Sequence, residues 1–254
     1  MTGPLDRLLT DPGLAVVADR LGAELPSADV RSLLLEIAAR RAAARSPKQV
    51  LEQYRTDRFC APGPVDPVVL AEVTASLLRS LSDEFEPVGL SPLAPLGTSS
   101  LVSPVPQNNV VTTMRLHDVA SDPTNALALE VAERRKDSAV RAVATRLCGL
   151  QRVVRAQRFD GPVSFAHFSL IGLVSAGRDR GDRAFEVGEI VRQVSAMASA
   201  LEELEPALAV RAVVSDLSGR FDEARQIVDR LADHLPAELD TSARTAAATT
   251  GTFA

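Results

Sequence analysis

The stretch VRAVATRLCGLQRVVRAQRFDGPVSFAHFSLIGLVSA, residues 140–176, decides the predicted fold. Its apolar residues partly alternate over 140–158, and they alternate again over 163–176. Alternation with a period of two is typical of a β-strand that is buried on at least one face. The two strands follow one another without a helix between them, and this order favours antiparallel pairing. Residues 140–176 therefore predict a strand–loop–strand unit at the centre of the chain.

Helical patterns lie on both sides of this unit. The segments with helical spacing of apolar residues, or with a helix-start signal, are 30–45, 46–54, 66–81, 122–135, 184–204 and 222–234. Ser46, Pro47 and Gln49 form a capping-box pattern, and Asp122 precedes a proline as a helix cap would. Shorter strands are predicted over 85–90, 109–113 and 208–215, with a proline-rich loop over 91–107. We predict an α+β fold, a mostly antiparallel sheet flanked by helices, rather than a doubly wound one.

The length of 254 residues allows one large domain or two small ones. We expect a helical N-terminal extension over 1–62 and an α+β core over 63–237. The last segment, 238–254, is small, polar and rich in Ala and Thr, and we expect it to be a disordered tail.

Composition narrows the class of protein. The chain is 46% hydrophobic and 24% charged, which excludes a collagen-like or wholly disordered protein. Aromatic residues make up only 4% and Trp is absent, so binding of single-stranded nucleic acid by stacking is not expected. A net charge of −5 makes the chain a poor generic binder of polyanions, and we expect no DNA partner.

Metal-site and targeting signals are also missing. The two cysteines, Cys60 and Cys148, lie far apart, and the three histidines are scattered, so neither a disulfide framework nor a metal site is expected. The first 30 residues lack a signal-peptide pattern, and no apolar run reaches 18 residues. We therefore expect a cytoplasmic protein that does not enter a membrane.

Three segments carry polar groups that a plain core would not need. They are the turn at Asp122 and Thr124, the strand end over 155–159, and the returning strand at His167 and Phe168. A guanidinium on one arm and an aromatic ring on the other suit a nucleotide. The planar guanidinium can bind a phosphate with paired hydrogen bonds, and the ring offers its face to a base. The alternative is an ordinary β-hairpin with salt-bridged arginines.

Two further polar runs stand outside these segments. Residues 107–115 (QNNVVTTMR) pack amides, hydroxyls and Arg115 into a short stretch. This run is either a polar pocket wall, with Arg115 as a second anion contact, or turn chemistry beside an edge strand. The run 178–183 (RDRGDR) is interpreted as a solvated turn.

Taken in order, the segments over about 66–216 resemble the catalytic core of class II aminoacyl-tRNA synthetases. They are closest to the histidyl-tRNA synthetase branch, which includes the related regulatory subunit of ATP phosphoribosyltransferase. The helix over 66–81 and the stretch Phe85–Pro92 resemble motif 1, which lies at the dimer interface in that family. The stretches 154–159 and 166–168 resemble motif 2.

The resemblance implies a role for each matching residue. Arg155 would be catalytic and hold the α-phosphate and the substrate carboxylate, Gln157 and Arg158 would bind the nucleotide, and Phe168 would stack on adenine. Asp122 and Thr124 would bind the substrate amino group, and we add Arg115 and His167 to the substrate contacts. The cofactors implied are ATP and Mg²⁺, and the partners are a small amino or carboxylic acid and a second copy of the chain. Whether a full-length tRNA binds is left open.

The sequence also departs from the family. The motif 2 glutamate is Gln157, the substrate-reading glutamine is replaced by Leu170, and Ser218-Gly219-Arg220 is the one faint candidate for motif 3. Two hypotheses therefore stand. The first is a synthetase-like protein that binds ATP and a small acid and forms an acyl-adenylate without a dedicated tRNA-binding domain. The second is a non-catalytic paralogue that regulates a partner enzyme. A third possibility is a scaffold that only mimics the motif order.

Overall fold

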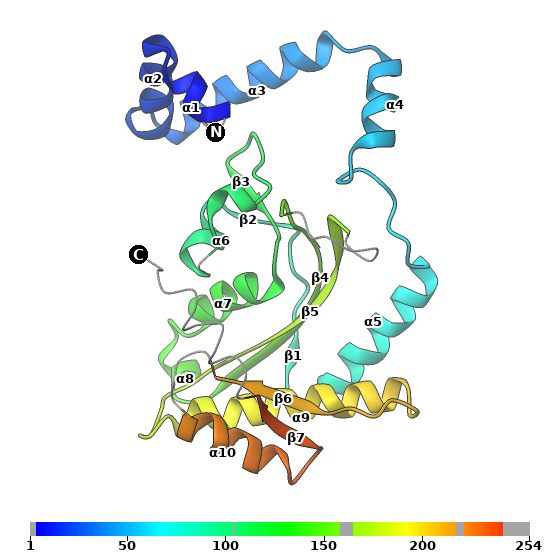
Figure 1. The fold of residues 1–254 in the computed structure, drawn as a ribbon. Coiled ribbons are helices and arrows are strands. Elements are labelled where there is room, and N and C mark those ends of the chain that lie inside the picture. The colour runs from blue at the N-terminus through cyan, green and yellow to red at the C-terminus, as the bar shows by residue number, and fades with distance from the viewer. Residues whose placement is uncertain (1–3, 104, 158–164, 217–220, 241–254) are drawn as a thin grey trace. The chain divides into compact units, whose positions relative to one another are not determined.

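The computed structural model describes residues 4–103, 105–157, 165–216 and 221–240 (Figure 1). The chain divides into two units. The first unit contains residues 1–62, 93–121 and 154–167, and the second contains 63–92, 122–153 and 168–254. Residues 93–121 and 154–167, which lie inside the predicted α+β core, thus group with the N-terminal helices.

The N-terminal part of the first unit is helical, as predicted. Its elements are α1 (Pro4–Leu9), α2 (Pro12–Asp19), a π-helical turn (Arg20–Glu24), α3 (Ser27–Ala43) and α4 (Pro47–Thr56). The capping box at α4 is confirmed. The backbone N–H of Ser46 donates to Gln49 Oε1 at 2.8 Å, and the backbone N–H of Gln49 donates to Ser46 Oγ at 3.3 Å. Each bond satisfies a donor that the first helical turn would leave unpaired.

The rest of the first unit corrects two predictions. The strand expected over 109–113 is reduced to an isolated antiparallel bridge between Thr112 and Asp118, because Gln107–Asn109 form a 3₁₀ helix. Leu116, at φ 59°, then turns the chain into β3 (His117–Val119). The loop expected over 91–107 is also wrong, because it contains β2 (Leu93–Pro95) and α6 (Thr98–Leu101). Strands β2 and β3 pair antiparallel. Prolines next to or within β2 are tolerated because an edge strand can lack ladder donors.

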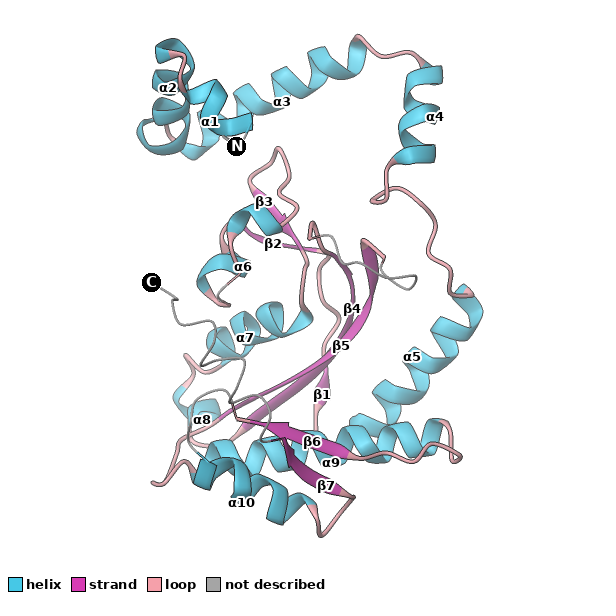
Figure 2. Ribbon diagram, in the orientation of Figure 1, coloured by secondary structure: helices cyan, strands magenta, loops and turns pink. Residues whose placement is uncertain are grey.

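The second unit holds the larger sheet and the longest helix (Figure 2). Its helices are α5 (Pro67–Leu81), α7 (Pro123–Arg134), α8 (Ser138–Arg141), α9 (Ala184–Leu204) and α10 (Phe221–Leu231). Its strands are β1 (Glu86–Pro87), β4 (Thr145–Val154, whose last residue belongs to the first unit), β5 (His167–Ala176, whose first residue belongs to the first unit), β6 (Ala212–Ser215) and β7 (Ala237–Asp240). None of the helices in the described ranges is long and apolar enough to cross a membrane.

The predicted α+β class is confirmed. Strand β4 lies between β1 and β5, and β1 pairs with β4 in parallel, with Glu86 opposite Leu147. Strands β6 and β7 also pair in parallel. The strand predicted from residue 140 begins at Thr145, because Asp137 caps the short helix α8 instead. Residues 238–240, assigned to the tail, belong to β7, and 241–254 lie outside the described residues.

Neighbouring residues of β4 face different helices. Cys148 packs with Leu81 and Phe85, in the cluster that also includes Ala200 of α9. Leu147 packs with Leu127 and Val131 of α7. Burial raises the pKa of the Cys148 thiol to about 11, so this cysteine stays protonated at neutral pH. The side-chain alternation of β4 therefore places one layer of helix on each face of the sheet.

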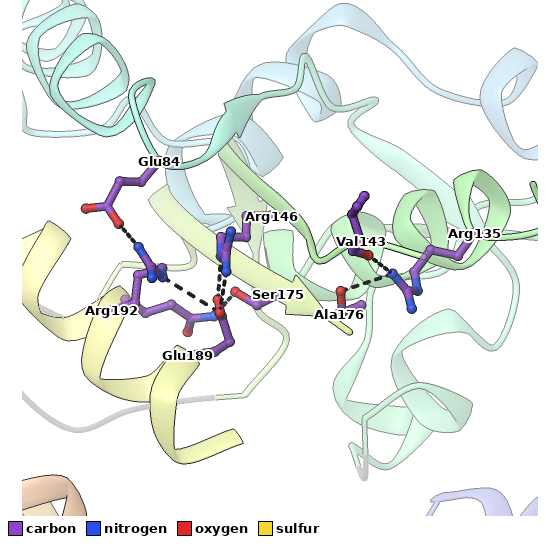
Figure 3. Close-up of polar contacts among 9 residues, drawn as sticks. Glu84, Arg135, Val143, Arg146, Ser175, Ala176, Glu189 and Arg192 are labelled. Atoms are coloured by element: carbon purple, nitrogen blue, oxygen red, sulfur yellow. Dashed lines mark hydrogen bonds and ion pairs between the residues drawn. The ribbon is translucent and has the colours of Figure 1, made fainter. Parts of the chain in front are cut away.

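One ion pair ties β4 to α9 on the α9-facing side (Figure 3). Arg146 Nε donates to Glu189 Oε2 at 2.7 Å, and Arg146 Nη2 donates to Glu189 Oε1 at 2.6 Å. Arg192 approaches the same carboxylate at 3.7 Å and pairs with Glu84 at 2.5 Å. The hydrogen bonds from Arg146, followed by those from Ser175, hold the pKa of Glu189 below its ordinary value of 4.5 against the effect of burial.

The variant Glu189→Gln is expected to lower the free energy of unfolding at pH 7 by about 3 kcal/mol, because it leaves the Arg146 charge without its partner. The pKa of Glu189 is lower in the folded state than in the unfolded state. Its contribution is therefore fully present above about pH 4.5 and disappears as the pH falls through the folded pKa. Urea unfolding at pH 7 and at acidic pH measures both effects.

The matched control is Glu238→Gln, which breaks the exposed 2.5 Å pair between Arg211 and Glu238. An exposed pair contributes about 0.5 kcal/mol. Equal losses in the two variants, or a Glu189→Gln loss that persists unchanged at low pH, would contradict the assignment.

Candidate functional site

Five residues of β5 face α7. Val174 and Ala176 pack against the cluster that contains Leu127 and Val131 of α7, whereas Ile171 and Leu173 pack on the side of α5 and α9. Since side chains alternate along a strand, the same face carries Phe168, Leu170 and Gly172. Phe168 is half-buried. The predicted adenine-stacking ring therefore lies on the α7 face of the sheet.

The predicted substrate turn lies against this same face. A Cβ atom on Gly172 would stand 2.9 Å from Pro123 Cγ and 3.2 Å from Thr124 Cγ2, so the strand and the start of α7 touch directly. Four residues of strand, about 13 Å, separate Gly172 from Phe168 along β5. This close approach brings Phe168, Asp122 and Thr124 to one face of the second unit.

Asp122 has a structural role in this turn. Its Oδ1 accepts from the backbone N–H of Thr124 at 2.9 Å and from Thr124 Oγ1 at 2.7 Å, so it caps α7 as predicted. The capping bonds orient the carboxylate, and the N-terminal end of the helix favours its negative charge. An oriented carboxylate is the group that an ammonium would require.

Gln151 is a further polar residue of this face, and sequence reasoning missed it. It lies four residues after Leu147 on β4, so its side chain is on the same face of the strand and points to α7. Only 4% of the residue is exposed. Its Nε2 donates to Ser91 O at 2.5 Å, whereas its buried Oε1 has no hydrogen-bond partner among the described residues. A buried acceptor without a donor costs about 1–3 kcal/mol, so a ligand donor there would be favoured. The signal available in the sequence was a single amide within an apolar alternation.

Arg155 belongs to the first unit, where the backbone holds it in place. Its Nε donates to Ser121 O at 3.2 Å, and its backbone N–H donates to Ala166 O at 2.8 Å. The backbone N–H of Val154 donates to Ala120 O at 2.8 Å. These bonds connect the end of β4 to the residues that directly precede Asp122 in the sequence.

A buried polar network supports Ser121. Asp118 is fully buried and accepts from Gln107 Nε2 at 2.8 Å and from the backbone N–H of Ser99 at 3.3 Å. Ser99 Oγ lies 3.0 Å from Ser121 Oγ. Gln107 belongs to the run 107–115, for which the sequence left a polar pocket wall and turn chemistry as alternatives, and it is a member of this network. Asp118 is a member that the sequence did not indicate.

The other predicted residues of the first unit have different surroundings. His167 Nε2 lies 2.6 Å from Ala61 O, and since a carbonyl only accepts, this ring nitrogen carries the proton. Arg115 is exposed on the turn before Leu116, and Gln157 is half-buried. Arg158 lies outside the described residues. The second unit thus unites Asp122, Thr124 and Phe168, and their convergence with the predicted residues of the first unit stays a prediction.

Comparisons with known proteins add the following. No family model and no curated protein sequence matches the chain. One similar solved structure is an ATP phosphoribosyltransferase regulatory subunit/histidyl-tRNA synthetase from Bacillus halodurans C, with 17% identity and a TM-score of 0.42 over 57% of this chain and 36% of that one. Another is PylSc, a pyrrolysyl tRNA synthetase from Desulfitobacterium hafniense, with 16% identity and a TM-score of 0.41 over 61% of this chain and 50% of that one. The chain therefore spans about a third and about half of these two structures.

The variant Gly172→Ala is expected to destabilise the protein by about 1–2 kcal/mol, because the new methyl group would overlap Pro123 and force α7 away from β5. Thermal or urea unfolding measures the loss. The control is Gly89→Ala, where a Cβ atom meets nothing within 4 Å and where the stability should stay within about 0.5 kcal/mol. A neutral Gly172→Ala would show that the turn does not rest on the strand.

Proposed function

We propose that the chain is a synthetase-like protein that binds ATP and a small amino or carboxylic acid and joins them as an acyl-adenylate. The observation that carries the proposal is the direct contact of Gly172 with the Asp122–Thr124 turn. This contact puts the Asp122 carboxylate, which caps α7, and the Phe168 ring on one face of β5. A carboxylate suits the ammonium of an amino acid, and a ring face suits adenine.

The reaction needs two anions held in line. A carboxylate oxygen of the acid attacks the α-phosphorus of ATP, a new bond joins that oxygen to phosphorus, and the bond to the bridging oxygen breaks as pyrophosphate leaves. In this proposal Arg155 holds the α-phosphate and the substrate carboxylate, and its hydrogen bond to Ser121 O sets the direction of the guanidinium beforehand. Placement of the reactants and stabilisation of the charge that develops on the phosphate supply the rate enhancement.

The proposed cofactors are ATP and Mg²⁺. Within the described ranges, no three His, Cys, Asp or Glu side chains gather in a way that could hold a metal ion. A nucleotide-bound Mg²⁺ does not require such a group, because phosphates and water supply most of its ligands and one or two carboxylates suffice. We therefore propose that Mg²⁺ enters with the nucleotide.

The second candidate function is regulation of a partner enzyme by a non-catalytic paralogue. The observation that favours it is Gln157, which stands where the related motif has a glutamate. A neutral amide accepts a hydrogen bond from an adenine amino group more weakly than a carboxylate does. A chain that binds the small acid but not ATP, and changes the activity of a co-purified enzyme, would favour this function.

Arg155→Ala is expected to lower ATP–pyrophosphate exchange at least 100-fold, since it removes the charge that faces the developing oxyanion. Exchange is measured with a panel of amino acids, and ATP binding by calorimetry. The control is Arg152→Ala, which removes an exposed arginine from β4 and should leave exchange within twofold. Absence of both exchange and ATP binding in the unaltered protein would refute the proposal.

We further propose that the protein forms a homodimer through α5 and the segment that follows it. Val68 and Val69, in the first turn of α5, are 63% and 51% exposed, and Val65 just before them is 58% exposed. Exposed apolar side chains that gather in this way are typical of an interface.

The double variant Val68→Asp and Val69→Asp is expected to halve the mass measured by light scattering, because two buried charges per protomer would oppose the contact. The control Val213→Asp changes an exposed valine of β6 and should leave the mass unchanged. A monomeric unaltered protein would exclude the homodimer.

A further inference from the structure

The second unit contains a cavity of about 550 Å³ that the proposed function does not use. It lies where the loop after β5, the start of α9, the segment before β4 and α10 come together. Its charged lining consists of five arginines and two acids: Arg146, Arg178, Arg180, Arg192, Arg230, Asp179 and Glu189. The lining therefore carries three net positive charges, in a chain whose net charge is −5.

The two acids of the lining are already engaged. Glu189 accepts both hydrogen bonds from Arg146 and also lies near Arg192, as Figure 3 shows. Asp179 accepts from the backbone N–H of Phe185 at 3.1 Å and of Arg183 at 3.2 Å. These backbone donors, Phe185 first, lower the pKa of Asp179, so this carboxylate is charged and satisfied at neutral pH.

Three arginines of the cavity are available to bind an anion. Arg178, Arg180 and Arg230 are exposed, and their guanidinium groups form no ion pair with any residue in the described ranges. They come from two separate elements, the loop after β5 and helix α10. Three guanidinium groups with like charge around one cavity repel each other, and an anion between them would relieve this repulsion.

The walls of the cavity are held by specific contacts. Arg135 Nη1 donates to Val143 O at 2.8 Å and to Ala176 O at 3.2 Å, so it joins the segment before β4 to the end of β5 (Figure 3). The Phe185 ring lies directly on Gly177, where a Cβ atom would stand 2.3 Å from Cε2. The loop that carries Arg178 and Arg180 is thus fixed at both of its ends.

We propose that this cavity binds a small phosphate-bearing molecule with three or more negative charges. Its volume lies in the range of small-molecule sites and exceeds that of a single phosphate. Guanidinium groups bind phosphate oxygens with two parallel hydrogen bonds, and they keep their charge at any working pH. The half-buried Phe185 ring supplies an apolar wall for the organic part of such a ligand.

Calorimetry with inorganic tripolyphosphate on the full chain tests the charge-recognition part of the proposal. This probe has no base and no ring-stacking group, so it does not require Phe168. Arg230→Ala and Arg178→Ala are each expected to weaken binding about tenfold, the effect of one lost charge-assisted contact. Arg225→Ala, which removes another exposed arginine of α10 that does not line the cavity, should change the affinity less than twofold.

Three results would overturn the proposal: absence of tripolyphosphate binding, equal weakening by Arg225→Ala and Arg230→Ala, or citrate binding as tight as that of tripolyphosphate. Arg155→Ala should leave the affinity for tripolyphosphate unchanged, and a loss in that variant would move the anion to the proposed nucleotide site. Unchanged thermal unfolding of the cavity variants confirms that they fold. The outcome is therefore independent of ATP–pyrophosphate exchange.

Discussion

The ion pair between Arg146 and Glu189 is the constraint on which the second unit depends. It joins the central strand to the longest helix through two hydrogen bonds of 2.7 and 2.6 Å, and its carboxylate is almost fully buried. Removal of either partner would leave a charge with poor solvation, so β4 and α9 are held in one register. Because the odd-numbered side chains of β4 then point to α7, the same pair indirectly sets the face on which Gln151 lies.

Asp122 caps α7, and in the proposed function the same carboxylate binds the ammonium of the substrate. The cap uses Oδ1 and the backbone of Thr124, and the contact with Gly172 presses the turn onto β5. A cap of this kind stabilises a helix in any globular protein, so it does not by itself indicate a ligand. The neighbours of the turn support the proposed recognition of a ligand. Phe168 and the amide oxygen of Gln151, which has no hydrogen-bond partner among the described residues, lie on the same face of the sheet.

Sequence reasoning succeeded where the decisive interactions are local. The capping box of Ser46 and Gln49, the cap at Asp122 and the bounds of α9 all follow from residues within a few positions of each other. It failed where the partner is distant in the sequence. Strand β3 (His117–Val119) pairs with Leu93–Pro95, about 24 residues earlier in the chain, and no local pattern shows that pairing. The grouping of Asp122 with Phe168 was expected from motif order alone, whereas the contact at Gly172 gives it a physical cause.

The run 178–183 shows why charge patterns need a fold before they can be interpreted. As a sequence it predicts a solvated turn, and its arginines are indeed exposed. The fold adds Arg230 from α10 to these arginines. It also places Asp179 where the backbone N–H of Phe185 donates a hydrogen bond to its carboxylate. An alternating run of charges thereby becomes an excess of positive charge around a cavity. The sign of a local field depends on which charged residues the fold gathers in one place, and the order of charges along the sequence does not show this.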